Sequence, residues 1–419
     1  MVLANYAAQG VIAGLGALMV AVLAQRGVPL ESQVGVLAGG AVPWALKFVV
    51  ALLLDMTPSW PLRRRGAALG ATLVLTAACL QIMAMAWSGG EAGLPRSLAT
   101  VAGVWVALNL VLATQDVIVD GLALDALGEH RALAGTLMGL GHALGFGLIT
   151  PLLLTPRLLE DGAAAALALP IPWLAVLVPI VVALCWMPGT PAGAREQTKT
   201  AGDHRYGPLL LLAVLLAFVL VMLGPNLTQA VSAQLLLGEL GWDYARFSSL
   251  ILPIGAVTGL LGALACGPLA SLLGPARAGA ITAAALGLAW RIFAGVEARW
   301  TSESTIVTLA IAEGLLQPAM LVALHTLALA AAARAPLPIT GFVVAMATLN
   351  APRVIGPLLA PAGLELLGWP GFFAACGAAS ILAGLLLLAL APRLNRRSKN
   401  DGAAGPAAKR PRAKREGAF

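Results

Sequence analysis

The sequence predicts an all-α membrane protein with twelve transmembrane helices in two six-helix halves. Three observations predict this: 59% of the 419 residues are hydrophobic, only 11% are charged, and one polar segment divides the apolar runs into two sets. Soluble domains carry about 25% charged residues. Because so few charges cannot cover a water-facing surface, we expect essentially no soluble domain.

Each expected span is a run of about 20 mostly apolar residues. The first half, residues 1–187, has runs at 4–24, 32–54, 66–87, 98–127, 132–155 and 163–187. The second half, residues 207–392, has runs at 208–237, 246–272, 276–296, 304–333, 338–366 and 370–391. Residues 188–206 form the expected cytoplasmic linker, and residues 393–419 a basic disordered cytoplasmic tail. Duplicated halves are typical of secondary transporters with a central pathway.

The basic residues predict the orientation of the chain. With both termini on one side, that side holds 18 basic residues and the opposite loops hold five. Positive residues favour the cytoplasmic side, so both termini are predicted to be cytoplasmic. The basic residues between Arg393 and Arg415 predict contact with anionic lipid headgroups and not with nucleic acid.

The sequence lacks the usual marks of an enzyme. It has no P-loop, no nucleophile elbow and no run of metal ligands, and its four cysteines lie singly in separate apolar runs. The glycines from Gly135 to Gly147 follow no strand, so they predict close helix packing and not a nucleotide loop. We therefore expect no catalytic residue, no metal and no cofactor.

The stretch Ala113–Asp125 places Gln115, Asp116 and Asp120 inside an apolar run. An ionised carboxylate at the bilayer centre costs at least about 2.5 kcal/mol, so both acids need a partner, water or both. A spacing of four places them on one helix face. They are the predicted proton-coupling residues. The alternative is a structural pair, locked to Lys47 or Arg353, that only sets helix orientation.

Lys47 and Arg353 lie too deep in their spans to reach the headgroups easily, and Asp116 is the first-choice partner for each. Whether Lys47 meets the solute or only Asp116 is left open. Asp55 is predicted to form a cytoplasmic gate with three arginines, and topology marking explains the same residues equally well. These arginines are Arg63, Arg64 and Arg65.

Other polar groups within the spans are candidates for the solute pathway or for ion pairing. The charged and titratable ones are Glu313, which shares a helix face with Gln317, and His142 and His325. The histidines are also well explained as packing residues with hydrogen bonds. The uncharged ones suit a hydroxylated or amide-bearing solute, and interhelical hydrogen bonding explains them equally. They are Asn5, Gln9, Asn109, Asn226 and Gln229.

Several motifs carry a family resemblance. The fourth run contains A-T-Q-D and then D-G-L-A-L, between Ala113 and Leu124. The second contains P-W-A-L-K-F at Pro43–Phe48 and L-L-D at Leu53–Asp55. Similar landmarks in the second half are Ala312-Glu313, Ala351-Pro352-Arg353 and Gly368-Trp369-Pro370. Together they resemble the peptide and acetyl-coenzyme A transporter family of the major facilitator superfamily, which includes AmpG-type muropeptide permeases. The resemblance implies twelve spans, alternating access and proton coupling.

The chain departs from that family where the substrate would be recognised. Muropeptide permeases usually carry an arginine shortly after the second aspartate and another in the fifth span, where this chain has Ala123 and His142-Ala143. The D-G-x-A-L form is closer to the acetyl-coenzyme A branch, although the usual tryptophan of that branch is Leu122 here. The expected solute is therefore muropeptide-like, coenzyme A ester-like or peptide-like.

The expected function is secondary active, proton-coupled transport of a polar solute by a monomer in a bacterial inner membrane. The expected partners are that small-molecule solute, protons and the lipid bilayer. A siderophore or drug permease of the same superfamily is one alternative. A receptor or assembly factor that reuses the bundle without transport is another.

Overall fold

A computed structural model describes residues 2–25, 27–56, 62–88, 97–127, 131–150, 208–332 and 337–403. The helices before residue 151 are α1 (Val2–Gln25), α2 (Leu30–Leu46), α3 (Phe48–Met56), α4 (Leu62–Ser88), α5 (Leu98–Leu127), α6 (Arg131–Ala143) and η1 (Leu144–Ile149). Those after residue 207 are α11 (Pro208–Ala233), η4 (Gln234–Glu239), α12 (Tyr244–Leu273), α13 (Pro275–Gly295), η5 (Glu297–Arg299), α14 (Glu303–Ala332), α15 (Pro338–Asn350) and α16 (Pro352–Ala403). Every element in these ranges is helical, as predicted.

Nine helical segments in the described ranges are long and apolar enough to cross a membrane. The predicted spans fall on described helices, apart from the sixth, residues 151–155 of the fifth and residue 333 of the tenth, which lie outside the described residues. The sixth span, 163–187, and the linker, 188–206, lie outside the described residues, so the number twelve and the division into equal halves stay predictions. Large apolar side chains such as Leu209, Leu272 and Leu366 are exposed, which suits contact with lipid.

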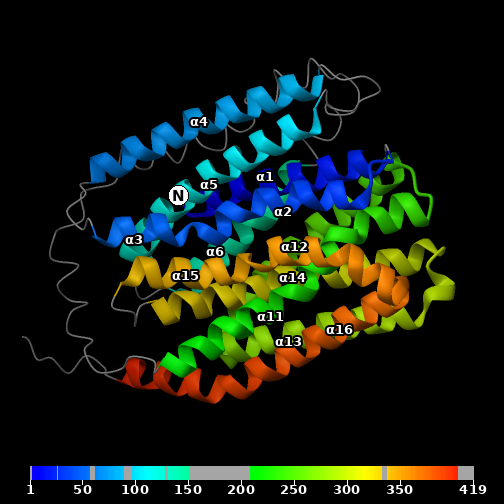
Figure 1. The fold of residues 1–419 in the computed structure, drawn as a ribbon. Helices are drawn as coiled ribbons and strands as arrows, with labels where there is room; N and C mark the ends of the chain where they lie inside the picture. The colour runs from blue at the N-terminus through cyan, green and yellow to red at the C-terminus, as the bar shows by residue number, and fades with distance from the viewer. Residues whose placement is uncertain are drawn as a thin grey trace, which may run out of the picture.

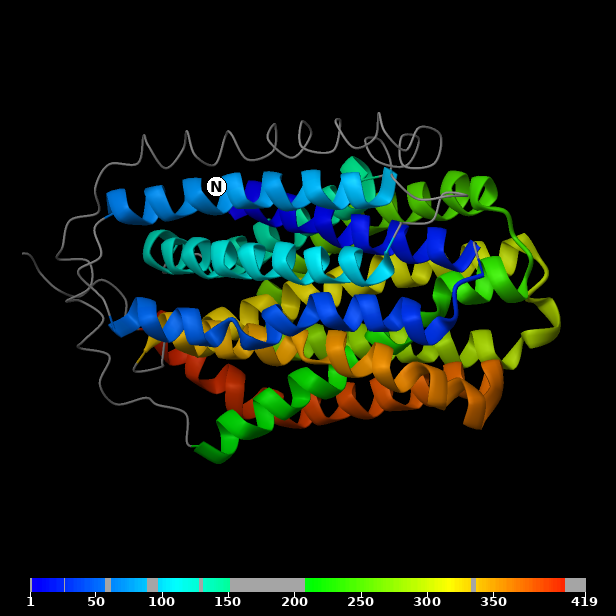
Figure 2. The ribbon, with the colours of Figure 1, turned by 45° about the horizontal axis from the view of Figure 1, so that its top comes forward.

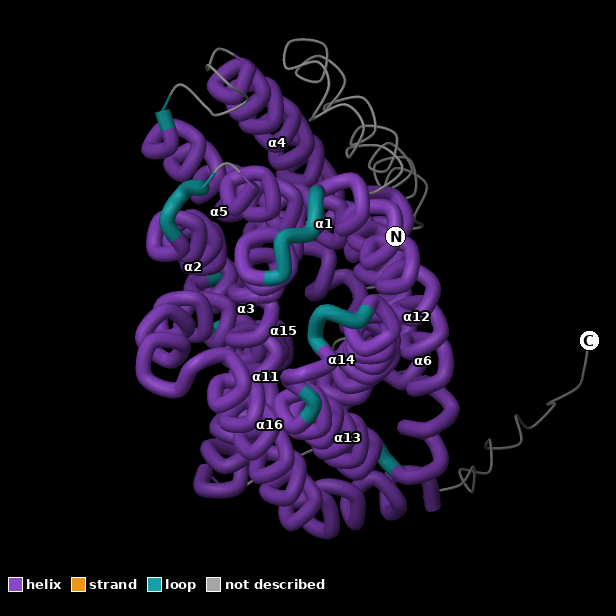
Figure 3. Tube along the Cα trace, turned by 90° about the vertical axis from the view of Figure 1, so that its right-hand side faces the viewer, coloured by secondary structure: helices purple, strands orange, loops and turns teal. Residues whose placement is uncertain are grey.

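The helices form an elongated bundle (Figure 1). The helices of residues 2–127, from blue to cyan, occupy one side of the bundle, and α11, α13 and α16 occupy the opposite side in both side views (Figures 1 and 2). Figure 3 looks along the bundle and shows α14 and α15 between these two groups. The core follows the same division, because one buried cluster is made mainly of residues before 120 and another mainly of residues after 213.

Two predicted spans are broken where a charged residue lies. The second span, expected to be continuous over 32–54, is divided into α2 and α3 at Lys47, four residues after Pro43. The eleventh is divided into α15 and α16 at Ala351, where Pro352 has no N–H to donate to the preceding turn. Within α16 a second break at Gly368, with φ 63° and ψ 173°, separates the eleventh and twelfth spans.

Helix α16 continues to Ala403, and the residues after 403 lie outside the described part of the chain. The arginines and lysine after residue 392 are good helix formers, which suits the length of α16. The disordered cytoplasmic tail stays a prediction.

The glycines of the fifth span pack α6 and η1 closely against α1. A Cβ added at Gly145 would meet the backbone of Ala7, and one added at Gly141 would meet the carbonyl of Leu3. The interpretation of this glycine run as helix packing is confirmed. The close approach brings α1, and its polar residues, next to the centre of the bundle.

Candidate functional site: a buried cluster around two aspartates

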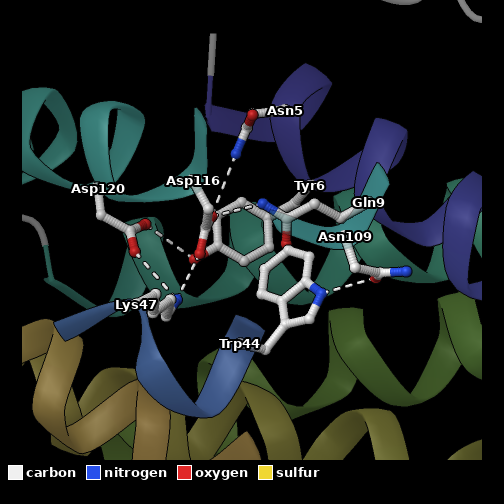
Figure 4. Close-up of polar contacts among 8 residues, drawn as sticks. All are labelled: Asn5, Tyr6, Gln9, Trp44, Lys47, Asn109, Asp116 and Asp120. Atoms are coloured by element: carbon white, nitrogen blue, oxygen red, sulfur yellow. Dashed lines mark hydrogen bonds and ion pairs between the residues drawn. The ribbon is translucent and has the colours of Figure 1, made fainter. Parts of the chain in front are cut away.

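Asp116 and Asp120 are both fully buried in α5, with 1% and 0% of their surface exposed. Their spacing of four directs both side chains from one face of α5 toward α1 and the junction between α2 and α3 (Figure 4). Asp116 lies well inside α5, 11 residues before its end at Leu127. The two carboxylates are therefore neighbours at membrane depth.

Lys47 provides the positive charge for both carboxylates. Its Nζ lies 2.5 Å from Asp116 Oδ2 and 3.7 Å from Asp120 Oδ2, and the lysine is buried (Figure 4). The expected pairing of Lys47 with Asp116 is present. Because one lysine serves two acids, this group by itself carries one negative charge in excess when both acids are ionised.

Helix α1 contributes the hydrogen bonds that distinguish the two acids. Asp116 Oδ1 accepts from Asn5 Nδ2 at 3.3 Å and from Gln9 Nε2 at 2.5 Å. Asp120 Oδ1 accepts from the Tyr6 hydroxyl at 2.9 Å. Asp120 Oδ2 is buried and accepts no hydrogen bond from the described residues. The ionised form of Asp116 therefore has more stabilising partners than that of Asp120.

The remaining contacts hold this cluster in place. Gln115 Nε2 donates to Asn5 Oδ1 at 3.0 Å, which ties α5 to α1. Trp44 Nε1 donates to Asn109 Oδ1 at 2.8 Å, and Asn109 Nδ2 donates to the carbonyl of Trp105. The Trp44 ring centroid lies 5.5 Å from Lys47 Nζ, within cation–π range.

Sequence reasoning did not nominate Tyr6 or Trp44. The helix spacing could have indicated both residues. Tyr6 precedes Gln9 by three residues and Trp44 precedes Lys47 by three, so each shares a helix face with a nominated residue. A search for polar stripes along single helices would have found them.

Arg353, His142 and His325 approach the cluster from other helices. Electrostatic interaction links Arg353 with Asp116, His142 and His325. Within the described ranges, however, Arg353 forms no ion pair, so the expected direct pairing with Asp116 is not formed. Both oxygens of Asp116 are already occupied by Lys47, Asn5 and Gln9. His325 is buried beside Tyr6, with 6.0 Å between the ring centroids, and the His142 ring stacks on Phe146.

Comparisons with known proteins agree with a transport fold. No protein-family model matches the sequence. A structure of the human organic anion transporter MFSD10 (TETRAN) has a TM-score of 0.62 and 16% identity over 92% of this chain and 96% of that chain. The chain has the major facilitator fold. A curated relative, the "Folate-biopterin transporter" of Synechocystis sp. (strain ATCC 27184 / PCC 6803 / Kazusa), is 36% identical over 154 residues. These residues are 36% of this chain and 29% of the relative's length.

Both similar proteins are transporters, in agreement with the prediction that this protein is not an enzyme. The finer resemblance to the peptide and acetyl-coenzyme A transporter family stays a prediction. In the part of the chain that the structure describes, no group of three or more His, Cys, Asp or Glu side chains is arranged to hold a metal ion.

Asp55 connects two parts of the bundle that are distant in the sequence. Its Oδ2 accepts from the backbone N–H and the hydroxyl of Thr340, both at 2.7 Å. Thr340 lies in the first turn of α15, and the N-cap residue Leu337 offers no side-chain hydrogen bond. The Asp55 carboxylate therefore takes the place of a capping side chain and binds the end of α3 to the start of α15. The side chains of Arg63, Arg64 and Arg65 lie outside the described part of the structure.

The other nominated residues do not join the aspartate cluster. Glu313 accepts a hydrogen bond from Trp290 Nε1 at 2.6 Å, which directs it toward α13. Asn226 donates to the carbonyl of Met222 in its own helix. Gln229 is exposed and Gln317 is half-buried. The site that the structure assembles is thus built from α1, the α2–α3 junction and α5, with α6, α14 and α16 bordering it.

Proposed function

We propose that this protein is a secondary transporter that moves a polar organic solute across a bacterial inner membrane by alternating access, with both termini in the cytoplasm. The observation that carries the proposal is the pair of buried aspartates sharing Lys47 at membrane depth. Such a group is costly to bury, and a role in moving a proton or solute explains its presence. The transport fold and the transporter relative support the same class.

The proton is proposed to bind at this pair. Asp120 is the better acceptor, because its Oδ2 has no hydrogen-bond donor among the described residues, whereas Asp116 receives Lys47, Asn5 and Gln9. Protonation removes the charge that Lys47 balances at Asp120 and weakens the hold between α2–α3 and α5. The two groups of helices then rock and expose the site to the other side.

Pterins and folates are the first solute class to test, because the relative that matches part of this chain is a folate-biopterin transporter. The uncharged amides around the cluster, Asn5, Gln9 and Gln115, suit the donors and acceptors of a pterin ring. Muropeptides, coenzyme A esters and peptides follow from the sequence resemblance, and siderophores or drugs complete the panel. A receptor or assembly factor without transport is the competing class.

Uptake by the purified protein in liposomes tests the proposal. With an inward proton gradient, wild-type vesicles are expected to accumulate labelled biopterin or folic acid above protein-free vesicles. The variant Asp120→Asn is expected to fold, because Asp116 still balances Lys47, and to lose proton-driven accumulation. Wild-type accumulation in Asp120→Asn would refute the coupling role. Equal flux with and without the protein across the whole solute panel would favour the non-transporting class.

A further inference from the structure

Arg353 is a cation near the proposed proton site that forms no ion pair with either aspartate among the described residues. It lies mid-span, 15 residues after the start of α15 at Pro338 and 15 residues before the break at Gly368. Its side chain is partly exposed, and in the described ranges it has no acidic partner. An arginine at this depth is costly to bury without a counter-ion. The planar guanidinium group of an arginine presents N–H donors in a geometry that matches the oxygens of a carboxylate or a phosphate.

His325 provides an independent sign of a missing ligand at the same place. The residue is only 7% exposed, and its Nδ1 is buried without a hydrogen-bond partner among the described residues. Buried polar atoms are normally hydrogen-bonded, so an open one calls for an explanation. His325 lies beside Tyr6, which donates to Asp120, and the charge of Arg353 acts on both His325 and Asp116, so both residues border the aspartate cluster.

A count of charge connects this neighbourhood with the proton site. The ionisable groups that meet here come from six elements: Tyr6 on α1, Lys47 between α2 and α3, Asp116 and Asp120 on α5, His142 on α6, His325 on α14 and Arg353 on α16. With neutral histidines and tyrosine, the two cations balance the two ionised aspartates. A proton on either aspartate leaves one positive charge in excess, and one bound carboxylate restores balance.

On the basis of the proposed transport function, we propose that Arg353 and His325 bind a carboxylate of the solute, and that this anion and one proton on the aspartate pair bind and cross together. Each ligand supplies the charge that the other needs, so each raises the affinity for the other. The contact sequence His325, Tyr6, Asp120 joins the two sites: the histidine ring lies against Tyr6, and the tyrosine hydroxyl donates to Asp120. Solutes that carry a carboxylate are thus preferred, and a monocarboxylate is moved without net charge.

Two pterins that differ in one charge test the carboxylate site in proteoliposomes. Pterin-6-carboxylate carries the anion, and biopterin has the same ring without it. Arg353→Gln is expected to reduce uptake of pterin-6-carboxylate about tenfold or more relative to uptake of biopterin by the same variant, since hydrogen bonds to charged groups are among the stronger ones. Arg353→Lys is expected to retain a part of the uptake of the anion. Arg291→Gln, an exposed arginine within α13, is the matched control and should alter neither. Equal effects of Arg353→Gln on both pterins would overturn the proposal.

A measurement on the wild-type protein tests the stoichiometry without any variant. Uptake of pterin-6-carboxylate is expected to rise with an inward proton gradient and to be unchanged by a potassium diffusion potential of either sign. A response to the potential would show that net charge moves and would overturn the pairing of one proton with one carboxylate. This result stands even if Arg353→Gln fails to fold.

If wild-type vesicles take up neither pterin, the proposal that the solute is a pterin is wrong, and the carboxylate site is still untouched by that result. The carboxylate site is then decided by binding to the purified protein of benzoate compared with benzyl alcohol. Benzoate that binds the wild type about tenfold more tightly than it binds Arg353→Gln, with no such difference for benzyl alcohol, supports the site. Equal binding of benzoate to both proteins rejects it.

Discussion

At the scale of single residues, Lys47 determines the character of the site. It is one of the largest fully buried side chains in the described core, and it lies at the break between α2 and α3 with two carboxylates within 4 Å. A buried ion pair of this kind is weak evidence for stability, because desolvation offsets much of the attraction. Removing one partner is costly, since it leaves the other charge buried and unbalanced.

This asymmetry predicts the outcome of a double-mutant cycle. Lys47→Met is expected to lower the free energy of unfolding by about 3–5 kcal/mol, because Asp116 and Asp120 then face each other without a cation. The double variant Lys47→Met with Asp116→Asn is expected to recover most of that loss. Thermal unfolding in detergent solution measures both. If the double variant is no more stable than Lys47→Met, the two residues are not energetically coupled.

At the scale of elements, the approach of α1 to α6 and η1 positions the donors of the cluster. Asn5, Tyr6 and Gln9 reach α5 from α1 because glycines on α6 and η1 let the backbones meet. Small residues serve this purpose in membranes, where packing, rather than exclusion of water, holds helices together. The glycine contacts therefore fix the geometry of the hydrogen bonds to Asp116 and Asp120.

A matched pair of glycine substitutions tests the close approach. Gly145→Ala places a methyl group against the backbone of Ala7 and is expected to destabilise the fold by about 1–3 kcal/mol, with a loss of transport. Gly103→Ala, in α5, meets open space and is expected to be neutral or to stabilise by about 0.5–1 kcal/mol. Thermal unfolding of the two variants compares them directly. Equal stability of both would contradict the packing role of Gly145.

At the scale of the whole molecule, Asp55 joins α3, in the group of helices before residue 128, to α15, which lies between the two groups (Figure 3). The contact links α3 with α15 across 285 positions of sequence, so it must break if α3 and α15 separate at that end. The proposed gate is thus a carboxylate that caps a helix distant in the sequence. Its loss biases the equilibrium between conformations without touching the aspartate cluster.

Cysteine accessibility tests this gate. In a background with Ile339→Cys, a buried position beside Gly121, Asp55→Ala is expected to speed maleimide labelling. Loss of a helix cap costs about 0.5–2 kcal/mol, which corresponds to a rate about 2- to 30-fold higher. Asp243→Ala is the control, because Asp243 caps α12 from within its own segment by accepting from Arg246 N. Labelling that is equally fast in both variants would show that Asp55 does not hold this end closed.

The sequence by itself determined the membrane class, the position of every described span and the placement of Asp116 and Asp120 on one helix face. These properties follow from local hydropathy and from helix periodicity, which a single stretch of chain contains. It also suggested Asp116 as the partner of Lys47, because few acids lie at that depth.

Only the tertiary structure decided which polar groups meet. The contacts of Asp116 with Lys47 and Gln9 span 69 and 107 positions, and that of Asp120 with Tyr6 spans 114. Among the described residues it left Arg353 without an ion pair, and it turned Glu313 toward Trp290 instead of the cluster. Pairings of this kind depend on how the helices pack and rotate against one another, and hydropathy leaves that rotation undetermined because lipid-facing and core-facing positions are equally apolar.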